Sequence, residues 1–140
     1  VIYEVHMYQP HEYTQQLIPG GKYQTSYTYP GTIAGVSWNP AQMTTVLSPV
    51  RNFQTNFSAR IHVGEFSAAR YAGGAATYLR DCMNIFEGYG WSWTYHAYRE
   101  AKVWNLEYAD SPVADNLAVR SAVPTDRYNQ VVGWGLNLNQ

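Results

Sequence analysis

The sequence predicts an α/β fold with parallel strands, and three observations carry this prediction. Residues 1–8, 59–66 and 91–95 have the β-branched and aromatic composition of short strands. Apolar residues at helical spacing follow each of the first two strands, and further helix signals follow the third. This alternation is typical of consecutive right-handed βαβ units, which build a parallel sheet. With 140 residues in all, residues 1–140 are expected to form a single domain.

The first strand is expected over residues 1–8 (VIYEVHMY), where apolar and polar residues alternate until Pro10 stops the pattern. Residues 9–38 are rich in Pro, Gly, Gln, Thr and Tyr and are predicted to form a long irregular segment. A loop of this length inside a domain is usually functional or conceals short elements.

The first helix is predicted to begin at Asn39, a residue type that caps helices, with Pro40 in the first helical position. One apolar stripe then runs to about residue 56, through Met43, Val46, Leu47, Val50 and Phe53.

The second strand is expected over residues 59–66 (ARIHVGEF). The second helix ends at Gly88 and carries one apolar face, made of Ala75, Leu79, Cys82, Met83 and Phe86. Because Cys82 is the lone cysteine, it forms no intrachain disulfide, and its place in the pattern predicts an inert core residue.

The third strand is expected over residues 91–95 (WSWTY). After an irregular stretch, a short helix is predicted near residues 112–123. A last helix follows Pro124 and Thr125, with Tyr128, Val131 and Val132 as its apolar residues.

Charge and composition exclude several kinds of partner. Nine Lys+Arg against ten Asp+Glu give no basic surface for nucleic acid, so no nucleic-acid partner is expected. No apolar stretch reaches the roughly 18 to 20 residues of a membrane span, and residues 1–10 lack the features of a signal peptide. No cofactor is indicated, and no metal either, because His6 and His11 stand without a ligand cluster of recognised spacing.

Candidate site residues stand where the strands end, since ligands of parallel α/β folds lie at the carboxyl ends of the strands. These residues are His6 and Tyr8, then Glu65, then Trp91, Trp93, Tyr95 and His96. A carboxylate that attacks an anomeric carbon, a phenol that orients it and indoles that stack on a sugar would make a glycoside site. Taken singly, each residue also has a structural role open to it: a carboxylate at a helix N-terminus, a hydrogen-bonded core histidine, and tryptophans in the core. The aromatic content of 16% fits either interpretation.

Three ordered segments resemble the C-terminal part of glycoside hydrolase family 5, in its cellulase-like endoglucanases: HMYQPHEYT at 6–14, IHVGEFS at 61–67 and GYGWSWTYHAYRE at 88–100. Residues 48–67 and 124–129 also resemble helices of that family, so the resemblance reaches about residue 130. It implies a partial, half-barrel-like TIM (β/α)8 barrel: three consecutive βα units with parallel strands, which correspond to strands six to eight.

The resemblance also implies residue roles in a retaining glycosidase that hydrolyses β-1,4-glucan or cellooligosaccharides. Glu65 corresponds to the nucleophile, and His6 and Tyr8 to a pair that contacts the substrate and the nucleophile. Either Trp91 or Trp93 corresponds to the tryptophan under the sugar, and alternation puts both on the same side of the strand.

Residues outside the strands are assigned to substrate binding. His96, Arg99 and Glu100 would line the cleft from the loop after the third strand, and His11 would do so from the loop after the first.

The sequence departs from the family because the first five strands, and the acid/base glutamate on strand four, have no counterpart. Retaining hydrolysis needs two carboxyl groups about 5 to 5.5 Å apart, and this chain supplies one at a matching position. The acid would come from a second chain, from Glu12 or Glu100, or from water.

The missing acid leaves two alternatives to a catalytic chain: a non-catalytic remnant that self-associates and binds oligosaccharide, and a piece of a longer enzyme. The catalytic chain and the remnant both predict a homo-oligomer that completes the open sheet. Family resemblance further implies a secreted or extracellular location.

Overall fold

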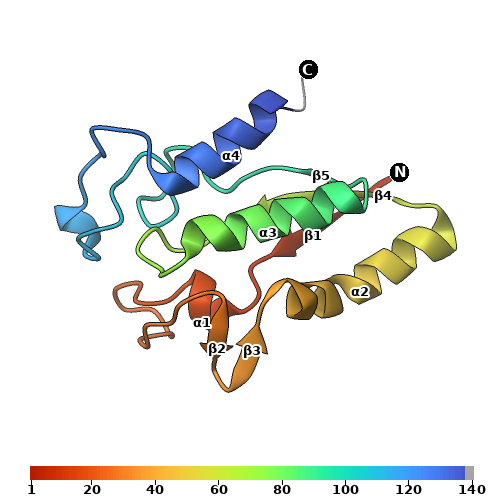
Figure 1. Cartoon of the computed structure of the whole chain (residues 1–140), viewed down its shortest axis with the longest axis horizontal. Helices are drawn as coiled ribbons and strands as arrows, with labels where there is room; N and C mark the ends of the chain where they lie inside the picture. The colour runs from red at the N-terminus through yellow and green to blue at the C-terminus, as the bar shows by residue number, and fades with distance from the viewer. Residues whose placement is uncertain (138–140) are drawn as a thin grey trace.

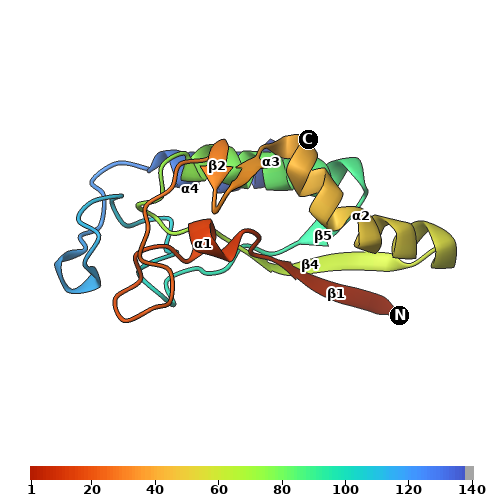
Figure 2. The same ribbon diagram turned by 90° about the horizontal axis from the view of Figure 1, so that it is seen from below.

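The chain folds into a parallel three-stranded sheet that is covered by helices on one side. The structure is a computed structural model that describes residues 1–137. The strand order is β1 (Ile2–Met7), β4 (Arg60–Phe66), β5 (Ser92–Trp93), and both pairings are parallel (Figure 1). The predicted α/β class and parallel sheet are therefore confirmed. Seen from below, α2 (Pro40–Phe57), α3 (Ala75–Gly88) and α4 (Asp126–Asn137) lie on one side of the sheet (Figure 2).

The helix signals in the sequence act as predicted. The Asn39 side chain accepts a hydrogen bond from the Gln42 amide at 3.1 Å, which satisfies one of the free N–H groups at the start of α2. At the other end, Ser58 takes a left-handed conformation with φ of 48° and closes the helix. α3 ends at Gly88, and α4 occupies the place predicted for the last helix.

Residues 9–38 hold more structure than the sequence suggested. They contain the short helix α1 (His11–Thr14) and an antiparallel hairpin, β2 (Gly31–Ile33) with β3 (Val36–Trp38). Ala34 and Gly35 form its two-residue turn with φ of 49° and 83°, the positive values that such tight turns need. Strands of three residues are too short to give a periodic pattern. The expectation of a single irregular segment was therefore wrong.

The prediction of a helix near residues 112–123 was also wrong. Only one 3-10 turn forms there, η1 (Asp115–Leu117). Two buried arginines hold this part of the chain instead: Arg70 donates to the Ala109 carbonyl at 2.8 Å and Arg127 to the Tyr108 carbonyl at 2.7 Å. Because these bonds satisfy main-chain carbonyls directly, the loop is ordered without regular structure.

The core lies between the sheet and the helices. Phe66 of β4 meets Phe86 of α3 edge-to-face at 5.2 Å, and Ile61 and Val63 of the same strand are buried beside them. Cys82 is buried in this core, as the pattern of α3 predicted, and burial raises the pKa of its thiol well above the ordinary value. The cysteine is therefore a packing residue.

An irregularity in β4 separates the core residues from Glu65. Val5 pairs with Val63, but the next residue, His6, pairs with Glu65, so Gly64 is an extra residue on β4. Without this bulge, Glu65 would share the face of Ile61 and Val63. With it, Glu65 lies on the opposite face, which we call the open face because within residues 1–137 no helix covers it (Figure 2).

None of the helices in residues 1–137 is both long and apolar enough to cross a membrane.

Candidate active site

The Glu65 carboxylate lies at the end of β4, beside the end of β1, where two predicted residues reach it. The Tyr8 hydroxyl donates a hydrogen bond of 2.9 Å to Oε2 of Glu65, and His6 Nδ1 lies 3.7 Å from the same oxygen. The Glu65 side chain keeps 38% exposure, so a ligand can approach the carboxylate. Glu65, His6 and Tyr8 therefore form one cluster, although Glu65 is 57 residues from Tyr8 in the sequence.

The Tyr8 hydroxyl is held in its protonated form. Burial raises its pKa well above the usual range, and the hydrogen bond to Glu65 raises it further, because a phenolate beside a carboxylate would be repelled. Tyr8 is thus a permanent donor to Glu65 Oε2 at neutral pH. Among residues 1–137, no hydrogen bond or ion pair reaches Oε1, so this oxygen is available to react.

Aromatic rings make a wall beside this cluster. The Tyr8 ring lies 6.1 Å from Trp104 and 6.4 Å from His96, and His96 lies 5.4 Å from Trp104. The indole N–H of Trp104 donates to the Thr14 carbonyl of α1 at 3.3 Å, which holds the ring beside Tyr8 and His96. Rings arranged in this way offer flat surfaces to an apolar ligand face.

Trp104 was not identified from the sequence. It stands in an irregular segment, and its position depends on the path of the loop that the buried arginines hold. The one available signal was that a lone tryptophan follows the last strand within a polar loop.

The prediction that Trp91 or Trp93 lies under a substrate is wrong in geometry, because both face the helices. Trp91 is only 2% exposed, and its indole N–H donates to Gln54 of α2 at 2.6 Å. Trp93 packs on Phe66 at 5.4 Å and donates to Glu87 of α3 at 2.7 Å. Alternation did place both on one side of the strand, but that side is the covered one.

The other predicted binding residues divide between the site and its surroundings. His96 belongs to the aromatic wall, and its Nδ1 lies 3.9 Å from Oε2 of Glu100, a side chain that is 71% exposed. Arg99 points its guanidinium at Glu107, with two contacts of 2.8 Å. This pair lowers the pKa of Glu107. His11 begins α1, and within residues 1–137 no hydrogen bond or ion pair joins its side chain to Glu65.

Comparison with solved structures shows the fold. A hyperthermophilic endo-β-1,4-glucanase in complex with substrate is similar over 94% of this chain and 39% of that one, at 17% identity and a TM-score of 0.69. Thermotoga maritima Cel5A in complex with mannotriose is similar over 93% and 39%, at 14% identity and 0.66. The cellulose synthase subunit Z of Clostridioides difficile is similar over 94% and 40%, at 14% identity and 0.63.

The chain has a glycoside-hydrolase-like fold. It spans about two fifths of the length of these structures, which are built on the TIM barrel. No family model and no curated protein sequence matches it. The likeness therefore concerns the path of the chain, and the geometry around Glu65 is what bears on chemistry.

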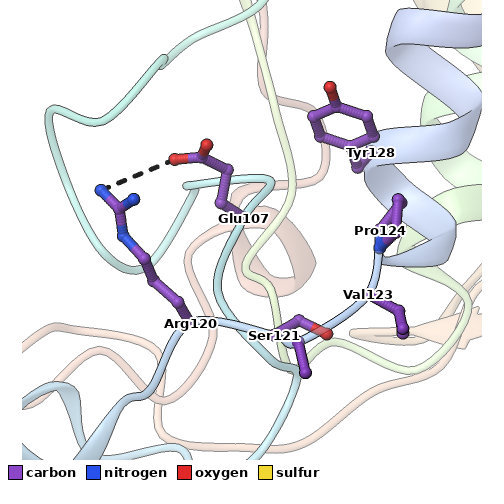
Figure 3. A pocket seen from close by; sticks show the side chains of 7 residues that line it. Glu107, Arg120, Ser121, Val123, Pro124 and Tyr128 are labelled. Atoms are coloured by element: carbon purple, nitrogen blue, oxygen red, sulfur yellow. Dashed lines mark ion pairs between the residues drawn. The ribbon is translucent and has the colours of Figure 1, made fainter.

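A hollow lies away from the Glu65 cluster. It is lined by Glu107, Arg120, Ser121, Ala122, Val123, Pro124 and Tyr128 (Figure 3). Arg120 lies 3.8 Å from the Glu107 carboxylate across its mouth. Because none of Glu65, Tyr8 and His6 lines this hollow, it is separate from the candidate site.

Within residues 1–137, no group of three His, Cys, Asp or Glu side chains is placed to share a metal ion.

Proposed function

We propose that the chain is the strand-six-to-eight part of a family 5 glycoside hydrolase, which cleaves β-1,4-glucan with retention of configuration and uses Glu65 as its nucleophile. The observation that carries the proposal is the Glu65 carboxylate at the end of β4, with one oxygen bound by Tyr8 and the other without a hydrogen-bond partner among residues 1–137. Its position at the carboxyl ends of parallel strands is where ligands of such folds lie. The fold of the similar structures supports the same proposal.

The geometry suits attack by Glu65 on an anomeric carbon. In the first step, Oε1 forms a bond to that carbon while the bond to the glycosidic oxygen breaks, and the leaving oxygen takes a proton from an acid. Water then attacks the same carbon, the bond to Oε1 breaks to release the carboxylate, and the conjugate base of that acid takes the proton that the water loses. Tyr8 orients Glu65 through Oε2, and the wall of Tyr8, His96 and Trp104 offers a flat surface to the sugar.

The acid in this mechanism comes from outside the Glu65 cluster. Outside that cluster, Oε2 of Glu100 lies 3.9 Å from Nδ1 of His96 in the aromatic wall, and Glu12 lies in the first turn of α1. Strands one to five of a complete barrel, or another chain, would provide the usual second carboxyl group. We therefore expect weak activity on plain glucan and better activity on substrates whose leaving group needs no proton.

The test is turnover of an aryl β-cellobioside by the wild type, Glu65→Gln and the matched control Asp126→Asn. Loss of the nucleophile should lower the rate by about a thousandfold or more. The control changes an exposed carboxylate in the first turn of α4, outside the Glu65 cluster, and should keep most of the rate. Equal rates for the wild type and Glu65→Gln would contradict the assignment of Glu65 as the nucleophile.

Oligosaccharide binding without catalysis is the second candidate. It is favoured by the aromatic wall, which can hold a sugar ring whether or not an acid is present. Calorimetry with cellooligosaccharides on the wild type and Trp104→Ala separates the cases. Binding that depends on Trp104, with no product that depends on Glu65, would favour this candidate.

The proposal includes a homo-oligomer that covers the free edge of β1. Ile2 is 64% exposed there, and the ring of Tyr3 leads through Phe53 to Phe57, which is 70% exposed. A strand edge with no partner among residues 1–137, beside exposed apolar side chains, is a surface that association would bury. Light scattering should find an oligomer, and a monomer at all concentrations would contradict it.

A secreted or extracellular location is likewise proposed, and detection of the protein in culture medium would test it.

A further inference from the structure

Glu4 lies on the open face next to His6, in a position that the proposed chemistry does not use. The two residues are two apart on β1, so their side chains emerge on the same side of the strand. Oε1 of Glu4 lies 2.9 Å from Nε2 of His6. On the other side of the same ring, Nδ1 lies 3.7 Å from Oε2 of Glu65. His6 thus stands between two carboxylates.

This contact determines where the His6 ring carries its proton. An ionised carboxylate only accepts hydrogen bonds, so the bond to Glu4 requires a proton on Nε2. The choice of tautomer and the orientation of a histidine ring are set in this way by the partner of its other nitrogen. Glu4 therefore turns the Nδ1 edge toward Glu65.

A second feature provides room for Glu4. A β-carbon at Gly64 would collide with the Glu4 carboxylate, because that side chain lies directly over the glycine. Gly64 is also the extra residue of the bulge that brings Glu65 to the open face. One glycine thus allows both carboxylates to reach His6 from opposite sides.

His62, on the same face, is held differently. Its Nδ1 lies 3.0 Å from the Ser92 hydroxyl and its Nε2 lies 2.9 Å from the Thr94 hydroxyl. Hydroxyls donate as well as accept, so these partners do not select one tautomer. His62 is therefore an internal control for His6.

We propose that Glu4 is a positioning residue that holds the His6 ring as its Nε2–H tautomer, with Nδ1 facing Glu65. The consequence for catalysis rests on the function proposed above, whereas the effect on the ring does not. Glu4 acts through His6.

The test is NMR of the histidine rings in the full chain, with tautomers from ring nitrogen shifts and ring mobility from carbon relaxation. In the wild type, neutral His6 should carry its proton on Nε2 and be rigid. Glu4→Ala should move the tautomers toward the mixture of a free imidazole and make the ring mobile. Glu4→Gln, whose amide oxygen still accepts a hydrogen bond, should restore most of the wild-type behaviour.

Two further variants make the result decisive. Gly64→Ala displaces the Glu4 carboxylate without changing it, and should reproduce the effect of Glu4→Ala on His6. Thr94→Val removes a partner of His62 and should change His62 but leave His6 unaltered. A His6 ring unchanged in both Glu4→Ala and Gly64→Ala would overturn the proposal.

Turnover of the aryl cellobioside then separates this proposal from the proposed function. Where the wild type turns over, Glu4→Ala should lower kcat by about ten- to a hundredfold, with a smaller change in KM and with rescue by Glu4→Gln. A kcat unchanged in Glu4→Ala would overturn the catalytic part. If no variant turns over, the proposed function fails, while the NMR result still decides the role of Glu4.

Discussion

The two faces of one sheet differ completely in chemistry. The face under the helices buries Ile61, Val63 and Phe66 of β4, together with Trp91 before β5. The open face presents charged and polar side chains: Glu4, His6, Glu65, His62 and Ser92. Since neighbouring residues of a strand point to opposite faces, the same three strands supply both sets.

The difference shows how a site can be built without disturbing a core. The covered face supplies stability through apolar burial, while the open face holds carboxylates and imidazoles that contact one another or nearby hydroxyls. The bulge at Gly64 places the Glu65 side chain on the open face instead of the covered face. Substitutions on the covered face should therefore alter stability, and those on the open face should alter chemistry.

The largest expected effect is alkaline unfolding of the covered side. Burial raises the pKa of Tyr95 to about 12 from an ordinary value of 10.0, and it raises those of Tyr13, Tyr29 and Tyr78 as well. In the unfolded chain these phenols lose their protons first, so stability is full below about pH 10 and falls as the pH rises toward about 12. Circular dichroism, recorded with phenolate absorbance, should show helix loss and tyrosine ionisation together. Full helix content at the upper end of this window would contradict the burial of these groups.

The next effect is a cavity in the covered face. Phe66→Ala removes a ring that is fully buried against Phe86, Trp93 and Tyr95. Loss of such a ring costs about 3 to 5 kcal/mol. Urea unfolding should show a lower midpoint with an unchanged slope. A loss below about 1 kcal/mol would mean that the face is not a packed core.

A smaller effect is expected where the two faces meet, at Tyr8. Tyr8→Phe removes the donor to Glu65 but keeps the ring in the aromatic wall. Stability should fall by about 1 kcal/mol, because the half-exposed carboxylate regains a partner from water. Turnover should fall more than stability, since Oε2 is no longer held. A variant with wild-type turnover would show that Tyr8 does not orient Glu65.

Much of the fold was predictable from the sequence because it depends on local signals. Asn39 and Pro40 marked the start of α2, Gly88 marked the end of α3, and the periodicity of α3 placed Cys82 in the core. The hairpin around Ala34 and Gly35 escaped prediction because three-residue strands have no measurable period.

The site was predictable only in part, because it depends on which face each strand turns outward. The positions of His6, Tyr8 and Glu65 at the strand ends correctly brought them together. Alternation along the strand predicts that Trp91 and Trp93 point to the same face of the sheet. It does not predict which face that is, so their position under the helices could not be foreseen. Trp104 depends on a loop ordered by two distant arginines, and such contacts leave no pattern in the sequence.

The smallest effect is expected for a matched change on the open face, His62→Val. His62 neighbours Ile61 and Val63 in the strand, but within residues 1–137 its side chain bonds only to Ser92 and Thr94 at the surface, so its loss opens no cavity. The free energy of unfolding should change by no more than about 0.5 kcal/mol. Loss of two surface hydrogen bonds lowers it, whereas valine raises it because valine favours the strand conformation more than histidine does. The measurement is the urea midpoint beside that of Phe66→Ala. A loss near that of Phe66→Ala would mean that the open face is packed in solution, as it would be if further strands or another copy of the chain covered it.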